Sequence, residues 1–237
     1  MQFKSLTFAT LLVILAPMGV LAAGTPNPNM RTLEVSGTGE AQAPPDLATL
    51  QVAIETHAPT AAEAAGSNAT LAQKVTDALK GKLGGKGAMW TGGYSLSPDY
   101  REVHNGKPTI VGYNADNSIT VETGALDLVG PMIDAAIAAG ANRVNSLDYS
   151  LRDNSKARSA AITKASKDAL AQAQALAAAL NVKLGPIVQA STVSEMIRPV
   201  PMMRAAYSSM AGAPPPTPVS AGQVTVPATV SLTYEIQ

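Results

Sequence analysis

Apolar and polar positions alternate in two stretches near the start of the chain, at residues 33–35 and 48–54, which is the pattern of half-buried β-strands. Because Pro44-Pro45-Asp46 separates the two stretches, we predict that these strands form a hairpin. Gly37 and Gly39 follow the apolar positions of the first strand. We interpret this pair as a kink or bulge, because a dinucleotide-binding loop needs a third glycine and a following helix.

Later strands are predicted from the same alternation at residues 90–96, 109–121, 147–151, 184–191 and 224–236. In the first of these, Trp90, Tyr94 and Leu96 are expected on one face. The polar run 114–118 predicts a bulge or an exposed edge within the second. Pro227 predicts an edge position or a bulge for the last strand, because proline cannot donate a ladder hydrogen bond.

Apolar positions spaced three or four residues apart predict three helices. The first begins at a Thr60–Glu63 capping box and ends at the glycines of residues 81–87. The second covers residues 129–137 and is closed by Gly140, and the third and clearest covers about 155–180 with Asn181 as a left-handed cap. The stripe expected to pack inward on the third helix is Ile162, Ala169, Ala173, Leu176 and Leu180. Together these elements predict an α+β fold, in which about three helices cover a mixed, mostly antiparallel sheet.

The first 23 residues have the three parts of a cleavable secretory signal peptide: Lys4, an apolar run over 6–15, and the small residues Ala22 and Ala23. The apolar run is too short to span a bilayer, so we expect no transmembrane helix in the mature chain. Residues 24–30 are expected to be a flexible leader, and residues 31–237 the folded domain. The chain is therefore predicted to work outside the cytoplasm.

Charge and composition exclude several classes of function. The chain has 17 basic and 17 acidic residues, and loss of Lys4 with the signal leaves a net charge of about −1. A balanced chain has no electrostatic reason to bind nucleic acid. There is no cysteine, which excludes disulfides, thiolate metal sites and cysteine nucleophiles.

Candidate catalytic and metal-binding residues are scattered. His57 and His104 are the only histidines and are far apart, whereas a zinc site needs three or four convergent ligands. Asp46, Asp99 and Asp116 are the loop carboxylates that a Ser-His-Asp triad would require, yet no nucleophile-elbow motif accompanies them. The pair Gly66-Ser67 is expected within a helix, which does not suit such an elbow. We therefore expect no enzymatic activity, no cofactor and no metal.

Two segments of the chain could bind a partner or a ligand. The basic residues of the third helix are interpreted as solvated surface, although they could meet an anionic partner: Lys156, Arg158, Lys164 and Lys167. Residues 194–222 form a proline-rich and methionine-rich loop too long for an ordinary connection. Three roles stay open for its methionines, in this order of preference: burial against a neighbouring subunit, a reversible oxidation sink, and Cu(I) ligation.

Five stretches in order resemble the SIMPL-domain family, specifically its bacterial periplasmic members: residues 35–40, 45–49, 94–98, 112–121 and 139–145. The resemblance implies an α+β fold for about residues 31–237, export, and no established catalytic residues. It also implies self-assembly, because the family's type member forms a ring-like, channel-shaped oligomer.

From residues and resemblance together we expect an exported, non-enzymatic protein of the periplasm, or one associated with the outer membrane, that forms a homo-oligomer. The exposed edges of its strands, including the closing strand, are the expected means of assembly. The alternative is a binding or stress-protection module that holds a small ligand or an envelope protein through residues 194–222.

Overall fold

The computed structural model describes residues 31–101, 107–193, 199–200 and 217–237. Within this part of the chain, three α-helices and one short 3₁₀ turn accompany two antiparallel sheets. The helices are α1 (Ala61–Leu83), α2 (Val129–Ala139) and α3 (Ser155–Ala179), and the turn is Leu126–Leu128. The strands are β1 (Thr32–Ala43), β2 (Leu47–Ala58), β3 (Gly87–Arg101), β4 (Thr109–Thr123), β5 (Arg143–Ser150), β6 (Leu184–Val193), β7 (Pro199–Val200) and β8 (Gln223–Ile236). The predicted α+β class is confirmed, and its strands are divided between two sheets.

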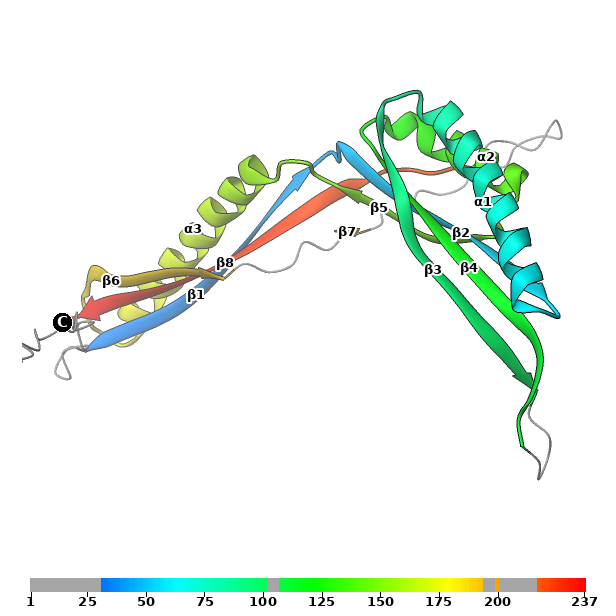
Figure 1. The fold of residues 1–237 in the computed structure, drawn as a ribbon. Coiled ribbons are helices and arrows are strands. Elements are labelled where there is room, and N and C mark those ends of the chain that lie inside the picture. The colour runs from blue at the N-terminus through cyan, green and yellow to red at the C-terminus, as the bar shows by residue number, and fades with distance from the viewer. Residues whose placement is uncertain (1–30, 102–106, 194–198, 201–216) are drawn as a thin grey trace, which may run out of the picture.

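The molecule has two limbs that meet at an angle (Figure 1). One, the α3 limb, contains strands in the order β1-β8-β6, with β7 pairing β8 and helix α3 on one face. The other, the α1–α2 limb, contains strands in the order β3-β4-β2-β5, with α1 and α2 on one face. Each limb encloses its own core, because each sheet has an apolar face that must be covered.

The predicted hairpin between the first two strands is wrong. Strand β1 pairs with β8, whereas β2 pairs with β4 and β5 in the other sheet. The two prolines explain the difference, since Pro45 keeps Pro44 extended and Pro44 does the same to Ala43. The chain therefore passes from one limb to the other instead of reversing on itself (Figure 1).

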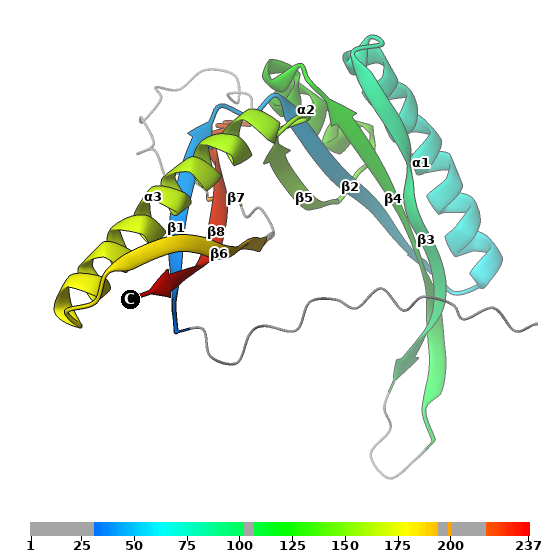
Figure 2. The ribbon, with the colours of Figure 1, turned by 90° about the vertical axis from the view of Figure 1, so that its left-hand side faces the viewer.

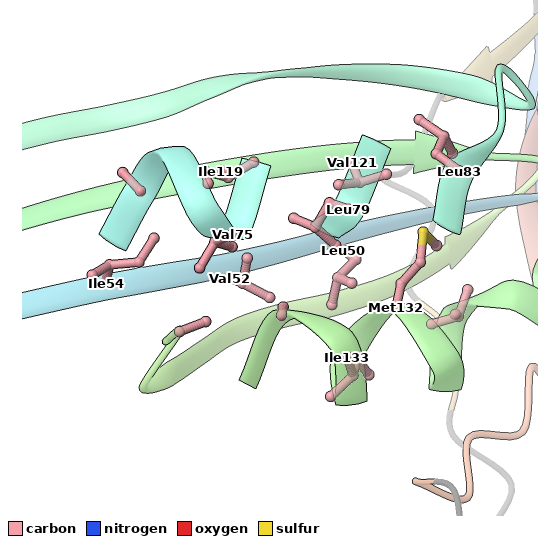
Figure 3. Close-up of a cluster of buried hydrophobic side chains, with 14 of the residues drawn as sticks. Leu50, Val52, Ile54, Val75, Leu79, Leu83, Ile119, Val121, Met132 and Ile133 are labelled. Carbon is pink, nitrogen blue, oxygen red and sulfur yellow. The ribbon is translucent and has the colours of Figure 1, made fainter. Parts of the chain in front are cut away.

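The core of the α1–α2 limb lies between its sheet and its two helices (Figure 3). Leu50, Val52 and Ile54 of β2 lie fully buried under Val75 and Leu79 of α1, and Met132 and Ile133 of α2 close the cluster. Fully burying each such side chain stabilises the fold by about 1.5–3 kcal/mol. Thr60 accepts a hydrogen bond from the backbone N–H of Glu63 at 3.3 Å, so the predicted cap of α1 is confirmed.

The buried residues of helix α3 are all alanines, which confirms Ala169 and Ala173 of its predicted stripe, and Ile162 is partly buried against the same cluster. The buried residues follow a strict four-residue spacing: Ala161, Ala165, Ala169, Ala173 and Ala177. Leu176 and Leu180, which were expected inside, are 42% and 59% exposed. Asn181 has φ 54°, as predicted for the left-handed cap.

Gly37 and Gly39 explain that alanine face. A Cβ at Gly37 would lie 2.3 Å from the carbonyl oxygen of Ala165, and one at Gly39 would lie 2.4 Å from that of Ala161. The helix backbone therefore rests almost directly on β1, and only small residues fit between the two. The predicted kink or bulge is wrong, because the pairing of β1 with β8 runs without a shift through both glycines.

The predicted common face of Trp90, Tyr94 and Leu96 is also wrong. Pairing with β4 shifts between Thr91 and Gly93, so Trp90 lies opposite Thr120 while Tyr94 lies opposite Asn117. An extra residue in a strand reverses the faces that follow it, and Trp90 therefore points away from the side of Tyr94.

Of the two predicted edge positions, the one in β4 is internal, whereas the one at Pro227 of β8 is an edge locally. Strand β4 is central, and residues 114–118 pair with both β2 and β3, so the bulge belongs to β3 instead. Strand β8 is also flanked on both sides, and its pairing with β1 continues through Pro227. Among the described residues, the pairing of β6 with β8 stops at Thr229, and β7 pairs only with residues 223–224 of β8. Pro227 therefore lies in a stretch of β8 that is paired with β1 on one side and has no described strand on the other.

Candidate functional site

The sheet edges are the surfaces of this fold on which association could be built. Strands β1 and β6 bound one sheet, and β3 and β5 bound the other. An edge strand presents unpaired N–H and C=O groups that can pair with another chain, and proteins usually block such groups with charges, bulges or covering elements. What protects each edge therefore decides whether another chain can pair with it.

The β1 edge is blocked by helix α3. The carboxylate of Asp168 accepts a hydrogen bond from the backbone N–H of Thr38 at 2.9 Å. One turn earlier, the Nζ of Lys164 donates to the backbone carbonyl of Glu40 at 2.7 Å. Two side chains spaced four apart on a helix share one face, so together they occupy an edge donor and an edge acceptor. Lys164 thus has a structural partner, while Lys156 and Lys167 are exposed, as expected for solvated residues.

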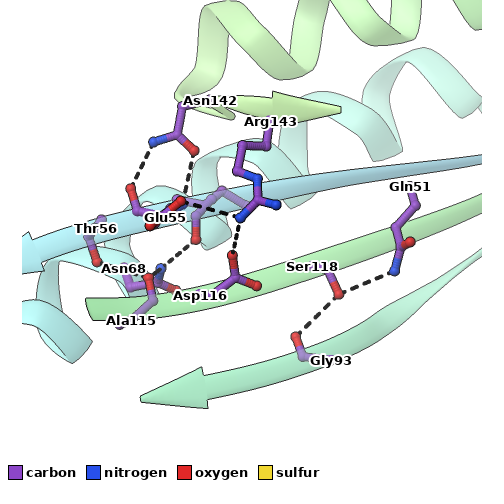
Figure 4. Close-up of polar contacts among 11 residues, drawn as sticks. Gln51, Glu55, Thr56, Asn68, Gly93, Ala115, Asp116, Ser118, Asn142 and Arg143 are labelled. Atoms are coloured by element: carbon purple, nitrogen blue, oxygen red, sulfur yellow. Dashed lines mark hydrogen bonds and ion pairs between the residues drawn. The ribbon is translucent and has the colours of Figure 1, made fainter. Parts of the chain in front are cut away.

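The β5 edge is short and charged (Figure 4). Just before β5, the side chain of Asn142 accepts from the N–H of Glu55 at 2.9 Å and donates to its C=O at 2.8 Å. Arg143 lies 3.3 Å from the carboxylate of Glu55 and 3.6 Å from that of Asp116. Asp148 adds a further exposed charge. Short length and charge are both features that discourage strand addition.

Most of β3 and all of β6 lack such charges. Residues 87–98 of β3 and 184–193 of β6 contain no charged side chain. Within the described residues, neither strand has a strand partner on its outer side. Large apolar side chains are exposed on both, with Tyr94 at 55% on β3 and Ile187 at 53% on β6. We call these two strands the open edges.

Bulges limit how much of each open edge is regular. Strand β3 shifts register between Thr91 and Gly93 and again between Asp99 and Tyr100, which leaves residues 93–99 regular. Strand β6 shifts twice before Gln189, which leaves residues 189–193 regular. Regular pairing to another strand is therefore confined to these two segments.

The residues considered for catalysis and metal binding lie apart. His57 contacts Asn114 through its Nδ1 at 2.8 Å, and His104 lies outside the described residues. Asp46 accepts from the backbone N–H of Arg152 at 2.7 Å, so it holds the start of β2 to the end of β5. Among residues the structure describes, no three His, Asp or Glu side chains converge as metal ligands.

Gly66 and Ser67 lie within α1, as predicted, and Asp99 lies on β3 away from Asp46. A cavity of about 190 Å³ opens between α1 and β3, lined by Thr76, Lys80, Met89, Trp90, Thr91 and Ile119. It is smaller than the 300–1,000 Å³ of ordinary ligand pockets. None of the described histidines or aspartates considered for catalysis lines this cavity.

Several polar contacts were not predicted from the sequence. Buried Asn68 of α1 donates to the carbonyls of Ile54 and Ala115 at 2.7 and 2.9 Å and so ties the helix to two strands (Figure 4). Asp134 of α2 accepts from the hydroxyl of Thr217 at 2.6 Å, which anchors the end of the proline-rich segment. Residues 194–198 and 201–216 of that segment lie outside the described residues, and with them all four of its methionines. The four-residue spacing of Lys164 and Asp168 places both side chains on one face of the helix, but the sequence does not show which strand they reach.

Comparison with known proteins places this fold in a family. The family model SIMPL, described as a protein of unknown function (DUF541), matches residues 33–234, and the chain belongs to this family. The resemblance found in the sequence motifs is confirmed. Within the described residues, no helix is long and apolar enough to cross a membrane.

The chain is 33% identical over 212 residues to the 26 kDa periplasmic immunogenic protein of Brucella melitensis biotype 1, covering 86% of this chain and 84% of that protein. The protein of the same name from Brucella abortus (strain S19) is equally similar. The uncharacterized protein YggE of Escherichia coli (strain K12) is 29% identical over 208 residues, covering 86% and 81%. These relatives span the whole fold, and two of the three are named as periplasmic.

Proposed function

We propose that this chain is an exported, non-enzymatic protein of the periplasm whose subunits assemble into an oligomer. The observation that carries the proposal is the pair of open edges, since uncharged edge strands with unpaired backbone groups are templates for association. The features of a signal peptide in residues 1–23 support export, as does the periplasmic naming of the Brucella relatives.

Absence of enzymatic activity belongs to the same proposal. A hydrolase would need a nucleophile, a base and an orienting group within hydrogen-bond reach of one another. His57, Asp46 and Asp116 each contact a different structural partner instead. The family resemblance adds a ring-like, channel-shaped arrangement as the form of the oligomer.

Light scattering coupled to size exclusion tests the assembly. The full chain should be expressed in a Gram-negative host, and the processed form recovered from the periplasmic fraction. We expect a mass that is a multiple of the protomer mass over a range of micromolar concentrations. A monomer at every concentration would contradict the proposal, and recovery from the cytoplasmic fraction would contradict export. Recovery with outer-membrane vesicles would extend the location to that membrane.

A second candidate is a binding or stress-protection module acting through residues 194–222. The supporting observation is the Thr217–Asp134 contact, which fixes one end of this segment to α2. A variant that lacks residues 201–216 should then no longer capture the envelope proteins that the native chain captures. Its oligomer should keep the same number of subunits. The same captured proteins with and without the deletion would reject this candidate.

A further inference from the structure

The two open edges belong to different limbs, one to each sheet (Figure 2). In each sheet the other edge is obstructed, by α3 side chains at β1 and by short length and charge at β5. A protomer therefore carries one open edge on the α3 limb and one on the α1–α2 limb. This distribution allows the open edge of one limb to meet the open edge of the other limb in a second copy.

We propose that β3 of one copy pairs with β6 of the next, antiparallel, as the joint of the oligomer. This inference rests on the proposed self-assembly and specifies its interface. The partner is a second copy of this chain, because the two open edges match each other in their uncharged stretches and in the charges that bound them.

Bounding charges select the direction of pairing. Exposed Lys183 immediately precedes β6 and Lys86 precedes β3, while Asp99 immediately follows the uncharged run of β3 and exposed Arg101 lies two residues further on. Antiparallel pairing places Lys183 at the end of β3 that carries both Asp99 and Arg101, where the charge next to the uncharged run, Asp99, is the opposite one. Parallel pairing would instead place Lys86 beside Lys183, and like charges side by side are destabilising.

The bulge of β3 argues against pairing two identical edges. Two copies of β3 placed antiparallel, with Lys86 opposite Asp99, would meet at a two-fold axis between Gly92 and Gly93. That point coincides with the register shift, where the ladder is disrupted. In an antiparallel pair of β6 strands, the two Lys183 side chains would lie at opposite ends of the pair. Among the described residues, no acidic side chain would then lie beside either lysine. Pairing of β3 with β6 avoids both difficulties.

A joint between two different surfaces has a consequence for symmetry. Each copy uses β3 toward one neighbour and β6 toward the other, so the contact is head to tail. Head-to-tail contacts close into a ring when the rotation per subunit permits and otherwise extend as a filament. A protomer with two limbs at an angle supplies such a rotation (Figure 1).

Cross-linking tests the joint, because the chain has no cysteine of its own. Ser95 and Ser191 are exposed and lie in the regular segments of β3 and β6, so we choose the variants Ser95→Cys and Ser191→Cys. The two purified full-length variants are mixed, allowed to exchange subunits, and treated with a short bis-maleimide. We expect a cross-linked dimer containing one copy of each variant, and none from either variant alone. The double variant should give a ladder of multimers.

The other outcomes separate two kinds of failure. A dimer from Ser95→Cys alone would show β3 pairing with itself and would overturn the joint. A native oligomer by light scattering that yields no β3–β6 cross-link would overturn the joint and leave self-assembly standing. A monomer by light scattering would overturn both proposals.

A second pair of variants tests the edge without cross-linking. Ser95→Lys places a charge in the middle of the β3 edge, and Ser67→Lys places the same charge on the exposed face of α1. We expect loss of the oligomer for Ser95→Lys only, with circular dichroism unchanged in both. An oligomer that survives Ser95→Lys and shows wild-type subunit exchange would overturn the joint.

Discussion

Gly37 and Gly39 set the distance between α3 and the sheet beneath it. Their missing side chains let the helix backbone lie against β1, and the alanines at 161, 165 and 169 complete the contact. Close packing of this kind loses its fit when even one methyl group is added. The pair is therefore a determinant of stability in the α3 limb, and its sequence pattern alone did not distinguish this role from a strand bulge.

We predict that Gly37→Ala lowers the free energy of unfolding of the α3 limb by about 2–3 kcal/mol, because the new methyl group meets helix backbone that cannot rotate away. Urea denaturation followed by circular dichroism measures the change. The control is Gly66→Ala in α1, where nothing lies within 4 Å of the added Cβ. There the same substitution should stabilise by about 0.5–1 kcal/mol. Equal effects at both sites would contradict the packing argument.

Asp153 lies two residues before Ser155, the first residue of helix α3. Asn154 occupies the N-cap position between them and makes no side-chain capping bond. The backbone N–H and the hydroxyl of Ser155 both donate to the Asp153 carboxylate, at 2.9 and 3.0 Å. These two bonds, the backbone one first, lower the pKa of this exposed carboxyl. A lowered pKa in the folded state means that the stabilisation is present when the carboxyl is charged and is lost as the pH falls through that pKa.

We therefore predict that Asp153→Ala lowers the thermal midpoint at neutral pH and that the difference from the wild type shrinks in acid, below the pKa of this carboxyl. Thermal scans across a pH series measure this. Asn154→Ala serves as the control and should change the midpoint little at any pH, since its side chain makes no cap bond. A difference that stays constant into strong acid would show that the charge of Asp153 is not involved.

At the scale of elements, sequence periodicity predicted where helices and strands lie in the chain, but it predicted poorly which elements pack or pair with each other. The capping box of α1, the Gly140 end of α2 and the turn at Asn181 depend on local geometry, and each was predicted. The predicted stripe of α3 was wrong at Leu176 and Leu180, because size was taken as the sign of burial, whereas the facing glycines reserve that side for alanine. That reason lies more than a hundred residues away in the chain.

The prediction of which strands pair with each other was wrong for a related reason. Alternation tells which residues share a face but not which strand lies alongside, and an extra residue such as Gly92 reverses the faces that follow it. The candidate site was predictable in kind, since exposed strand edges were expected. Which edges are open was not, because that depends on side chains such as Asp168 that reach across from another element.

We predict that removing both caps of the β1 edge makes this edge available for association. The double variant Lys164→Ala, Asp168→Ala frees the N–H of Thr38 and the C=O of Glu40 without changing the net charge. Concentration-dependent light scattering should then show species larger than the native oligomer.

The matched control for the caps is Lys74→Ala, Asp77→Ala on α1, which removes the same charges away from any edge. This control variant should retain the mass of the native oligomer. Masses that match the native oligomer in both double variants would indicate that the caps do not protect the edge.

At the scale of the whole molecule, the described residues form separate buried cores in the two limbs. Buried clusters fill each limb separately, and the α1–α2 limb is a continuous insertion between the first strand and the remaining elements of the other limb. Contacts that cross from limb to limb among the described residues are confined to few places, such as β7 beside β5. Limbs built in this way can lose structure separately, so that different probes need not report one transition.

We predict that Gly37→Ala reveals this separation. The chain has one tryptophan, Trp90, and it lies in the α1–α2 limb, whereas circular dichroism reports both limbs. In urea, the substitution should move part of the circular dichroism transition to lower denaturant and leave the midpoint of Trp90 fluorescence in place. Coincident shifts in both signals would show instead that the two limbs unfold as one unit.

Pairing of β1 with β8 joins the first strand of the fold to the last. In a chain that is threaded through a membrane from its N-terminus, β1 arrives first and then waits for the final residues before it can form its ladder. The α1–α2 limb needs no such delay, because its sheet is complete at Ser150. One limb can thus fold while translocation continues, and the other stays open to a chaperone, or to a neighbouring chain, until the end is released.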